Sequence, residues 1–354
     1  MKLVAARLNR YFFVVFVLAV ICQNSRIAHA NPYLAKPGEP VTKIRIGACA
    51  ITGGFIHLYA ALDNRLFDKY GINAEHVYVR GGAVAMAGLA GDEINFLYCN
   101  ADANIVRIGT GVDAKLVASP LIGLPYVVLA RKDIKRPADL KGKSIGVTRP
   151  GDFPYRLAKE FLKKFNLSEK EVTLATVGGT PTERYTALAQ DIFQATLIQP
   201  PLDARGKKDG FNVIYNLNDL GLPFIYSSLF TSARTWKERP AVVQKVVAAL
   251  AESVYFVEKN PELAMASVGK TLRMKDPDTL RSAYEAYAKN LVNRRMIVPA
   301  KLVVETLDIA RDEGITIRRK PNEIFDNTFV ENLDKSGFMK ELWGGAVPED
   351  RKRP

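Results

Sequence analysis

The chain has 354 residues, of which 48% are hydrophobic, and a formal net charge of +13. That length and apolar content are sufficient for two domains, each with its own core. Basic and acidic residues are interspersed without a run of five or more like charges, so the composition argues against nucleic-acid binding and fits a weak attraction of anions.

The first thirty residues have the organisation of a secretory signal peptide. A basic start precedes an apolar run at 11–22, too short for a membrane span of roughly 20 residues, and Ala28-His29-Ala30 follows. We therefore predict cleavage before Asn31 and a periplasmic location. Loss of the four basic residues of this segment would lower the net charge from +13 to +9. Retention of residues 1–30 as an anchor is the alternative, and Ile21 before Cys22 disfavours lipidation.

From residue 42, short apolar runs alternate with amphipathic segments of helical length. The pattern predicts strands over 44–49, 74–79, 94–98 and 116–118, with helices over 55–68, 83–90 and 101–108. Such alternation is typical of a mostly parallel sheet flanked by helices, and thus of the α/β class. We expect residues 31–122 to form the first part of one lobe.

A second series begins after a change of rhythm near residues 119–125. It predicts strands over 126–130, 144–148, 172–175, 194–198 and 212–215, and helices over 153–165, 182–189 and 202–207. Each series has about a hundred residues, a usual domain size. Residues 123–223 are therefore expected to form a second lobe.

Helices dominate the rest of the chain. Apolar residues recur at helical spacing after Pro240, and further helices are predicted from Asp276-Pro277, over 299–314 and over 326–336. Residues 224–343 should complete the first lobe, with these extra C-terminal helices packed on it. The tail 344–354, rich in Gly, Pro and charge, is expected to be disordered.

A series of short motifs resembles the nitrate/sulfonate/taurine-type ABC transporter substrate-binding proteins. The motifs are IRIG at 44–47, LFDKYGI at 66–72, Gly81-Gly82, AGDEINF at 90–96, GVDAK at 111–115, ADLKGK at 138–143 and Gly210-Phe211. Together they extend the resemblance over roughly residues 42–270. One departure is DIFQA at 191–195, where Gln194 stands in place of the family's usual aspartate.

The resemblance implies a two-lobed, type II periplasmic binding protein fold. Two crossovers, near 119–125 and 223–228, would join the lobes and allow them to close on a ligand. The chain would be the exported solute-binding component of an ABC importer, a monomer that captures a small polar or anionic organic molecule, or an oxyanion, and delivers it to an inner-membrane permease. The resemblance implies no catalysis, no cofactor and no metal.

Ligands of open α/β sheets bind beyond the carboxyl ends of the strands, where helix N-termini present backbone NH groups. Applied to the predicted strands, this rule selects the loops at 52–55, 80–82, 100–101, 148–153, 178–180 and 199–201. The resemblance places the pocket in the same loops. The candidate ligand-binding residues are Thr52, Gly53, Gly54, Phe55, Gly81, Gly82, Asn100, Arg149, Gly151, Asp152, Phe153, Thr180 and Gln199.

Backbone NH groups and one guanidinium are the candidate anion donors. Gly53 and Gly54 would allow a close approach of the backbone to an anion, or they form an ordinary turn. Arg149 would clamp a carboxylate, sulfonate or phosphate through two hydrogen bonds, or it is simply exposed.

Other candidates have alternative structural roles. Asn100 is a hydrogen-bonding candidate or a helix N-cap, and Asp152 is favoured as the cap of the helix from Phe153. Phe55 and Phe153 would sandwich a planar ligand or lie in the core. Gln199 is an uncharged contact candidate.

Cys49 and Cys99 are the two cysteines after residue 30, and neither lies in a CxxC motif or at metal-ligand spacing from a histidine. They should lie at the carboxyl ends of neighbouring parallel strands, where a bridge would tend to be strained and needs Cα atoms within roughly 7 Å. We expect free thiols, with a disulfide as the alternative. His57 and His76 are assigned no catalytic role, because no recognisable motif arranges a Ser or Cys with them.

Two other functions are compatible with this fold class. A pyrimidine synthase of thiamine biosynthesis shares it, but that type of enzyme carries a cysteine-rich motif, which this chain lacks, and is not exported. A periplasmic sensor, which presents its ligand to a receptor other than an importer, is not separated from a transport component by the sequence.

The predicted signal peptide is tested by the N-terminus of the exported protein. Because the basic start, the short apolar core and Ala-His-Ala occur together, we expect the protein from periplasmic extracts to begin at Asn31. Intact-mass and N-terminal peptide mass spectrometry measure this directly. A mass that includes residues 1–30 would contradict the prediction.

Overall fold

The computed structural model describes residues 31–177, 179–222 and 224–351. The predicted signal peptide lies outside the described residues. One compact unit runs over Tyr33–Pro354, and it contains two five-stranded sheets. Each sheet, with the helices that pack on it, is a lobe.

The sheet of the first lobe has the strand order β2-β1-β3-β10-β4. β1 pairs in parallel with β2 and β3, whereas β10 lies antiparallel between β3 and β4. The side chains of Ile44 and Ile46 on β1 are buried and alternate with the exposed Arg45, the pattern of a strand with one face in a core. The strands are β1 (Thr42–Ala48), β2 (Ile72–Tyr78), β3 (Phe96–Asn100), β4 (Ala114–Ala118) and β10 (Ser227–Ser232).

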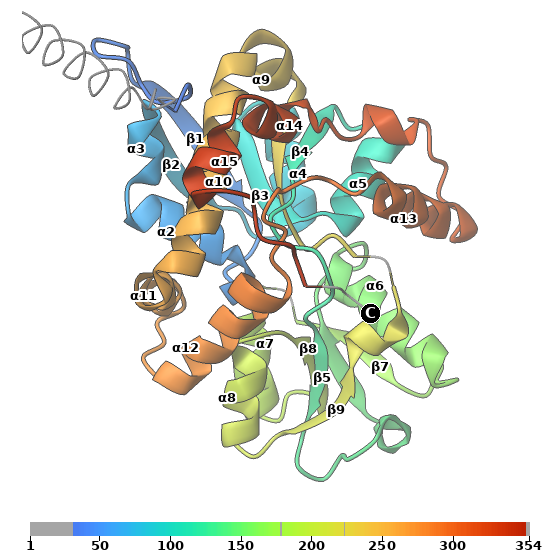
Figure 1. The fold of residues 1–354 in the computed structure, drawn as a ribbon. Coiled ribbons are helices and arrows are strands. Elements are labelled where there is room, and N and C mark those ends of the chain that lie inside the picture. The colour runs from blue at the N-terminus through green and yellow to red at the C-terminus, as the bar shows by residue number, and fades with distance from the viewer. Residues whose placement is uncertain (1–30, 178, 223, 352–354) are drawn as a thin grey trace, which may run out of the picture. The chain divides into compact units, whose positions relative to one another are not determined.

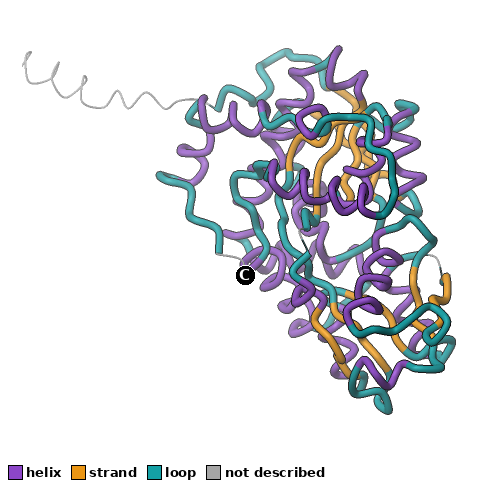
Figure 2. The backbone as a smooth tube through the Cα atoms, turned by 90° about the vertical axis from the view of Figure 1, so that its right-hand side faces the viewer, coloured by secondary structure: helices purple, strands orange, loops and turns teal. Residues whose placement is uncertain are grey.

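The sheet of the second lobe has the corresponding order β7-β6-β8-β5-β9. β6 pairs in parallel with β7 and β8, and β5 is antiparallel to β8 and β9. Figure 2 shows the strands in two separate groups, each surrounded by helices. The strands are β5 (Val127–Ala130), β6 (Ser144–Val147), β7 (Thr173–Thr176), β8 (Ala195–Ile198) and β9 (Asn212–Asn216).

The predicted two-lobed α/β architecture is confirmed, with one antiparallel strand in each otherwise parallel sheet. Figure 1 shows the arrangement of the elements. The helices that follow strands are α2 (Ile56–Asp63), α3 (Leu66–Lys69), α4 (Gly82–Ala90), α5 (Asp102–Thr110), α6 (Phe153–Lys164), α7 (Pro181–Ala189) and α8 (Leu202–Lys208). The later helices are α9 (Ala233–Glu238), α10 (Pro240–Lys259), α11 (Pro261–Leu272), α12 (Pro277–Tyr284), α13 (Ala300–Asp312), α14 (Thr328–Lys335) and α15 (Phe338–Trp343).

The chain crosses between the lobes twice, and the two crossing segments lie side by side. β4 leads to β5 through 119–126, and β9 leads back to β10 through 217–226. Gly123 N donates to Phe224 O at 2.9 Å, and Tyr226 N donates to Leu121 O at 3.0 Å. Adjacent crossovers of this kind are suited to act as a hinge.

The predicted helix over 55–68 is divided in the structure. α2 ends before Asn64, whose side-chain amide donates to Ala60 O, and Arg65 has the left-handed φ of 54°. A left-handed residue cannot continue a right-handed helix. The chain therefore turns there and starts again as α3.

β10 is a strand that the sequence pattern did not reveal. Its sequence, SSLFTS, is rich in Ser and Thr and resembles a loop, yet all six residues are buried. The buried hydroxyl groups are satisfied: Ser227 Oγ donates to Gly54 O at 2.8 Å, and Thr231 Oγ1 donates to Asn95 O at 3.2 Å. Such tertiary partners make a polar central strand tolerable.

The C-terminal helices pack mainly on the first lobe, as expected, with one exception. α10 contacts α2, α3 and α14, but α12 packs against α8 of the second lobe. Lys208 on α8 pairs there with Asp276 and Asp278 at 2.8 and 3.2 Å. α10 is long and apolar enough to cross a membrane by composition, but much of it is buried in the core.

The expectation of a disordered tail is wrong for the described residues up to Arg351. Val347 is buried, and Asp350 pairs with Arg294 at 3.1 Å. Arg294 also donates to the backbone carbonyl of Glu349. Gly, Pro and charge indicate disorder only where no partner is present, and here a buried arginine holds the tail.

The expectation of free thiols is also wrong, because Cys49 and Cys99 form a disulfide. Their Cα atoms lie 5.4 Å apart, within the range that a bridge requires. As expected, both cysteines lie at the carboxyl ends of adjacent parallel strands, β1 and β3. The bridge thus ties together the two strand ends from which loops 50–55 and 100–101 begin.

The disulfide should stabilise the first lobe. Replacement of both cysteines by serine is expected to lower the free energy of unfolding by about 2–4 kcal/mol, because the bridge closes a loop of fifty residues in the unfolded chain. Urea unfolding of the two proteins without reductant measures the difference. Thiol labelling of the wild-type protein under denaturing conditions, after removal of residues 1–30, should find no free thiol. Two labelled thiols would contradict the bridge.

His57 is a buried histidine without a hydrogen-bond partner on either ring nitrogen among the described residues. It lies on α2 at 0% exposure, and burial lowers its pKa to about 3. The neutral imidazole is therefore part of the packed core, consistent with the absence of an assigned catalytic role.

Protonation of His57 should make the fold acid-sensitive. In the unfolded chain His57 becomes protonated below about pH 6.5. In the folded chain it stays neutral until about pH 3. Stability present above pH 6.5 is thus lost toward pH 3, by up to about 1.4 kcal/mol per pH unit. Urea unfolding between pH 7 and 4 should show a shallower loss of stability for His57→Leu than for the wild type. Identical slopes for wild type and His57→Leu would refute this.

Candidate functional site

A cavity of about 80 Å3 lies between the carboxyl ends of the strands of both lobes. We call it the inter-lobe cavity. First-lobe residues around it come from the ends of β1 and β3 and from α4 and α5. Second-lobe residues come from the loops after β6, β7 and β8 and from the first turns of α6 and α7. Its lining residues are Cys49, Ala50, Thr52, Gly81, Gly82, Cys99, Asn100, Ala103, Asn104, Arg107, Tyr126, Thr148, Asp152, Phe153, Pro154, Gly179, Pro181, Arg184 and Gln199.

The structure brings together about half of the candidates from the sequence. Those that line the inter-lobe cavity are Thr52, Gly81, Gly82, Asn100, Asp152, Phe153 and Gln199. Those that do not line it are Gly53, Gly54, Phe55, Arg149, Gly151 and Thr180. Residues from each loop that the strand-end rule selects thus line the cavity, but in the loops at 52–55 and 148–153 some candidates line it and others do not.

Gly53 and Gly54 allow a close approach between parts of the protein. A Cβ on Gly53 would lie 2.8 Å from Pro201 Cδ, and one on Gly54 would lie 2.1 Å from Tyr226 Cε1. Phe55 is fully buried and packs edge-on against Tyr98 at 5.1 Å. In this structure the Gly-Gly-Phe segment serves packing.

Arg149 lies at the rim, outside the inter-lobe cavity. Its Nη2 donates to Arg80 O at 3.2 Å, and its side chain is 51% exposed. The neighbouring pair Arg80–Glu183, at 3.4 Å, is similarly exposed. The Arg149 side chain is so close to Gly81 that a Cβ there would meet Nη2 at 2.4 Å, so Gly81 leaves room for this contact between the lobes.

Thr180 and Gly151 have local roles. Thr180 is the N-cap of α7, where its hydroxyl accepts from Glu183 N and the Glu183 carboxylate accepts from Thr180 N. Gly151 has the positive φ of 84° and accepts a hydrogen bond from Arg107 Nη2 on its carbonyl. Neither Thr180 nor Gly151 lines the inter-lobe cavity.

Asp152 occupies the N-cap position of α6, but its side chain makes no capping hydrogen bond. It pairs instead with Arg107 across the lobes at 3.6 Å. The expected capping role is therefore wrong, because a guanidinium from the first lobe is the nearer partner. Asn100 does not cap α5, whose N-cap is Ala101; its side-chain amide donates to Tyr126 OH at 3.5 Å.

Arg184 is the most unusual group at the cavity, and sequence reasoning missed it. It is 1% exposed, and its guanidinium donates to two carbonyls, Gly179 O at 3.1 Å and Leu197 O at 3.4 Å. Its Nε has no partner, and no ion pair to a carboxylate is present among the described residues. Burial lowers the pKa of Arg184. A buried, unpaired cation is costly, so a counter-anion in the cavity would stabilise it.

Three helices direct their N-termini at the inter-lobe cavity. Gly82 begins α4, Phe153 begins α6 and Pro181 begins α7, and all three residues line the cavity. The partial positive charge of a helix N-terminus favours an anion. These ends act together with Arg184, which lies in the first turn of α7.

Several buried polar atoms of the cavity wall have no hydrogen-bond partner among the described residues. They are Gln199 Oε1, Thr148 Oγ1 and Arg184 Nε. Gln199 also joins the lobes, since its Nε2 donates to Thr52 Oγ1 at 2.9 Å. Polar atoms of this kind are normally satisfied by a partner or by water, so they indicate a polar occupant.

One signal in the sequence pointed to Arg184. Thr180-Pro181-Thr182-Glu183 is a capping-box pattern that starts a helix at Pro181. An arginine in the next position lies in the first turn, where the helix dipole disfavours a cation. Such a local conflict is expected mainly at functional sites.

Two solved structures of similar fold are named as binding proteins. The alkanesulfonate-binding protein SsuA from Xanthomonas axonopodis pv. citri, bound to MOPS, has a TM-score of 0.67 and 18% identity, over 82% of this chain and all of the other. The nitrate-binding protein NrtA from Synechocystis PCC 6803 has a TM-score of 0.65 and 12% identity, over 84% of this chain and 89% of the other. At these identities the similarity shows the fold.

Comparison of sequences assigns the family. A protein of Brucella abortus (strain 2308) with the provisional name of a binding protein is 26% identical over 236 residues, which are 65% of this chain and 72% of that protein. The profile of the family described as NMT1/THI5 like matches residues 54–264, more than half of the chain. The chain therefore belongs to the NMT1/THI5-like family.

Proposed function

We propose that this chain is an exported solute-binding protein that captures a small, singly charged anion in the inter-lobe cavity for an ABC importer. The observation that carries the proposal is the buried guanidinium of Arg184, which lines the cavity without a carboxylate partner. The fold and the family support a binding role. Export rests on the predicted signal peptide.

The charge of the cavity wall supports a monoanion. Its charged side chains are Arg107, Arg184 and Asp152, so two guanidinium groups face one carboxylate. Arg107 is paired with Asp152, which leaves the positive charge of Arg184 uncompensated. One negative charge on the ligand would neutralise the site, whereas a second would again be unpaired and buried.

The dimensions of the cavity support a small ligand. Its volume of about 80 Å3 is well below the roughly 300–1,000 Å3 of pockets for drug-sized molecules. Alkanesulfonate and nitrate, which the two structural neighbours are named for binding, each carry one negative charge. The structure thus favours this class over neutral pyrimidines.

Contacts from both lobes support capture by closure. Arg184 and Gln199 belong to the second lobe, whereas Thr52, Asn100 and Arg107 belong to the first. A ligand held by both sets would favour the arrangement in which the lobes meet, and the adjacent crossovers supply a hinge. The protein with its ligand enclosed is then the form that an inner-membrane permease would recognise.

Substitution of Arg184 separates an anion-binding role from a structural one. Thermal-shift and calorimetric titrations with sodium nitrate, methanesulfonate, taurine, benzoate and neutral uracil would identify a bound class. We expect Arg184→Met to weaken the bound anion by roughly 10- to 100-fold, since charge-assisted hydrogen bonds are lost. The same variant should keep or raise the melting temperature without ligand, because a buried unpaired charge is removed.

Arg149→Met provides the contrast. Its side chain lies at the rim and half in solvent, so we expect the affinity to change less than about threefold. An unchanged affinity in Arg184→Met would refute the proposed site, as would tight binding of uracil without binding of any anion. A large loss in Arg149→Met alone would restore the sequence-based hypothesis of an Arg149 clamp.

A further inference from the structure

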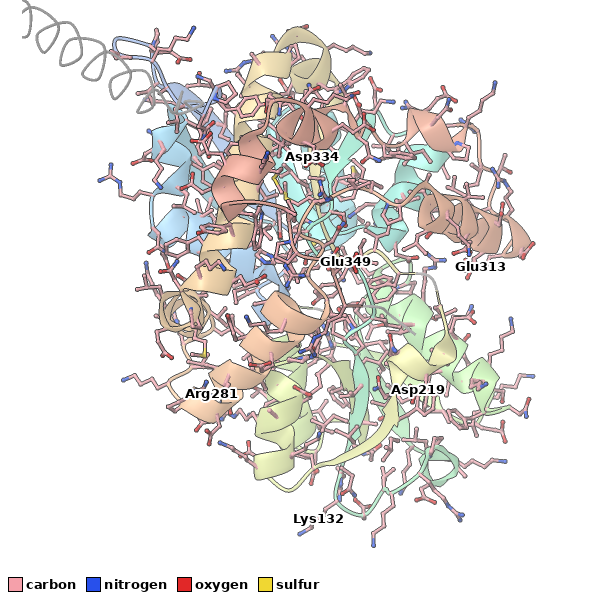
Figure 3. The ribbon with its side chains drawn as sticks, in the orientation of Figure 1. Lys132, Asp219, Arg281, Glu313, Asp334 and Glu349 are labelled. Carbon is pink, nitrogen blue, oxygen red and sulfur yellow. A yellow bond between two sulfur atoms is a disulfide. The ribbon has the colours of Figure 1, made fainter. Side chains whose placement is uncertain are left out.

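A charge cluster joins the lobes beside the inter-lobe cavity. Arg156 on α6 of the second lobe donates from Nη1 to Asp102 Oδ2 at 2.8 Å and from Nη2 to Glu313 Oε2 at 3.3 Å. Asp102 is the first residue of α5, and Glu313 directly follows α13, so both carboxylates belong to first-lobe elements. Glu313 is labelled at the end of α13 in Figure 3. One cation of the second lobe thus bridges two anions of the first.

This cluster is better shielded from water than the ion pair at the rim. The side chains of Arg156 and Asp102 are 18% and 14% exposed, whereas those of Arg80 and Glu183 are 62% and 50% exposed. Exposed ion pairs contribute little, because solvent and salt screen them. Removal of one member of a buried pair, in contrast, leaves an uncompensated charge in a poorly hydrated place.

The cluster is adjacent to the inter-lobe cavity but does not line it. Arg156, Asp102 and Glu313 face a second, smaller cavity of about 30 Å3, whose other walls are mostly apolar. Phe153 lines both cavities and is stacked on Phe224 at 4.2 Å. Arg156 is therefore placed to affect a ligand only through the position of α5 and α6.

The elements that Arg156 connects also carry the cavity wall. Asp102 lies between Asn100 and Ala103, and α6 begins with Phe153 and Pro154; all four of these neighbours line the inter-lobe cavity. α5 and α13 pack against each other, so the two carboxylates form one acceptor for the guanidinium. Separation of the lobes would break both hydrogen bonds at once.

We propose that Arg156 is a positioning residue that holds the lobes together over the inter-lobe cavity, with Asp102 and Glu313 as its two acceptors. Its effect on the ligand rests on the proposed function, since the inter-lobe cavity is where the ligand would be retained. The contact between the lobes itself does not depend on any ligand. Arg156 would set how often the cavity opens, whereas Arg184 would set which charge it holds.

The test measures the distance between the lobes in the protein without ligand. Spin labels are attached at Lys132→Cys, after β5, and at Lys340→Cys on α15, both exposed positions, in a Cys22→Ser background that leaves Cys49–Cys99 oxidised. Lys132 lies at the far tip of the second lobe in Figure 3. Double electron–electron resonance gives the distribution of distances. We expect Arg156→Met to raise the longer-distance population roughly tenfold, as two charge-assisted hydrogen bonds are lost.

The controls distinguish this contact from general effects of charge. Arg205→Met removes an arginine whose partner, Asp209, lies on the same lobe, and it should leave the distances unchanged. Arg156→Lys should restore part of the shorter-distance population, because it keeps the charge but not the fork of two donors. If Arg156→Met does not fold, Glu313→Gln, at the more exposed end of the cluster, replaces it with the same expected direction.

Unchanged distances in Arg156→Met, or in Glu313→Gln in its place, would overturn the proposal. An equal change in Arg205→Met would overturn it too. The measurement needs no ligand, so a chain that bound none of the tested anions would still reveal the effect of Arg156. If nitrate or methanesulfonate binds, its dissociation rate should increase in Arg156→Met while the preference among anions stays the same; a changed preference with unchanged dissociation would contradict the positioning role.

Discussion

The site depends on the burial of one arginine charge between two sheets. Arg184 lies at the N-terminus of α7 with two carbonyl acceptors and no carboxylate. In water a guanidinium is well solvated. In the wall of the inter-lobe cavity its charge is compensated only if the cavity contains a counter-anion or polar groups. The three helix N-termini add to the same positive potential. In the proposed function, binding of an anion and meeting of the lobes would therefore be coupled by electrostatics.

The two lobes provide different kinds of support for this site. In the first lobe, the disulfide between the ends of β1 and β3 fixes the loops that carry Thr52 and Asn100. In the second lobe, the capping box of Thr180 and Glu183 fixes the start of α7 and so the base of Arg184. Rigid supports of this type keep polar groups oriented before the ligand arrives.

Three contacts between the lobes are progressively more exposed to solvent. Gln199 and Thr52 meet within the inter-lobe cavity wall, Arg156 bridges two carboxylates behind Phe153, and Arg149 reaches Arg80 at the rim. The first contact would be sensitive to the ligand, the second shielded from it, and the third exposed to solvent. This separation allows affinity and rate of opening to be altered by different residues.

The sequence by itself determined the alternation of strands and helices, the change from one lobe to the next and the loops at the strand ends. These features follow from hydrophobic periodicity and from glycines at turns, which are local properties of the sequence. It did not reveal β10, whose Ser and Thr residues are buried only because Gly54 O and Asn95 O accept their hydroxyls. It also selected Arg149 as the candidate anion clamp and not Arg184, which is the buried arginine of the inter-lobe cavity. Arg149 lies in the loop after β6 and Arg184 in the first turn of α7, and only the packing of the lobes decides which one is buried and which one lies at the rim. Burial removes the hydration of a charge and so raises its free energy. Because burial arises from contacts between distant segments, the tertiary structure alone decides it.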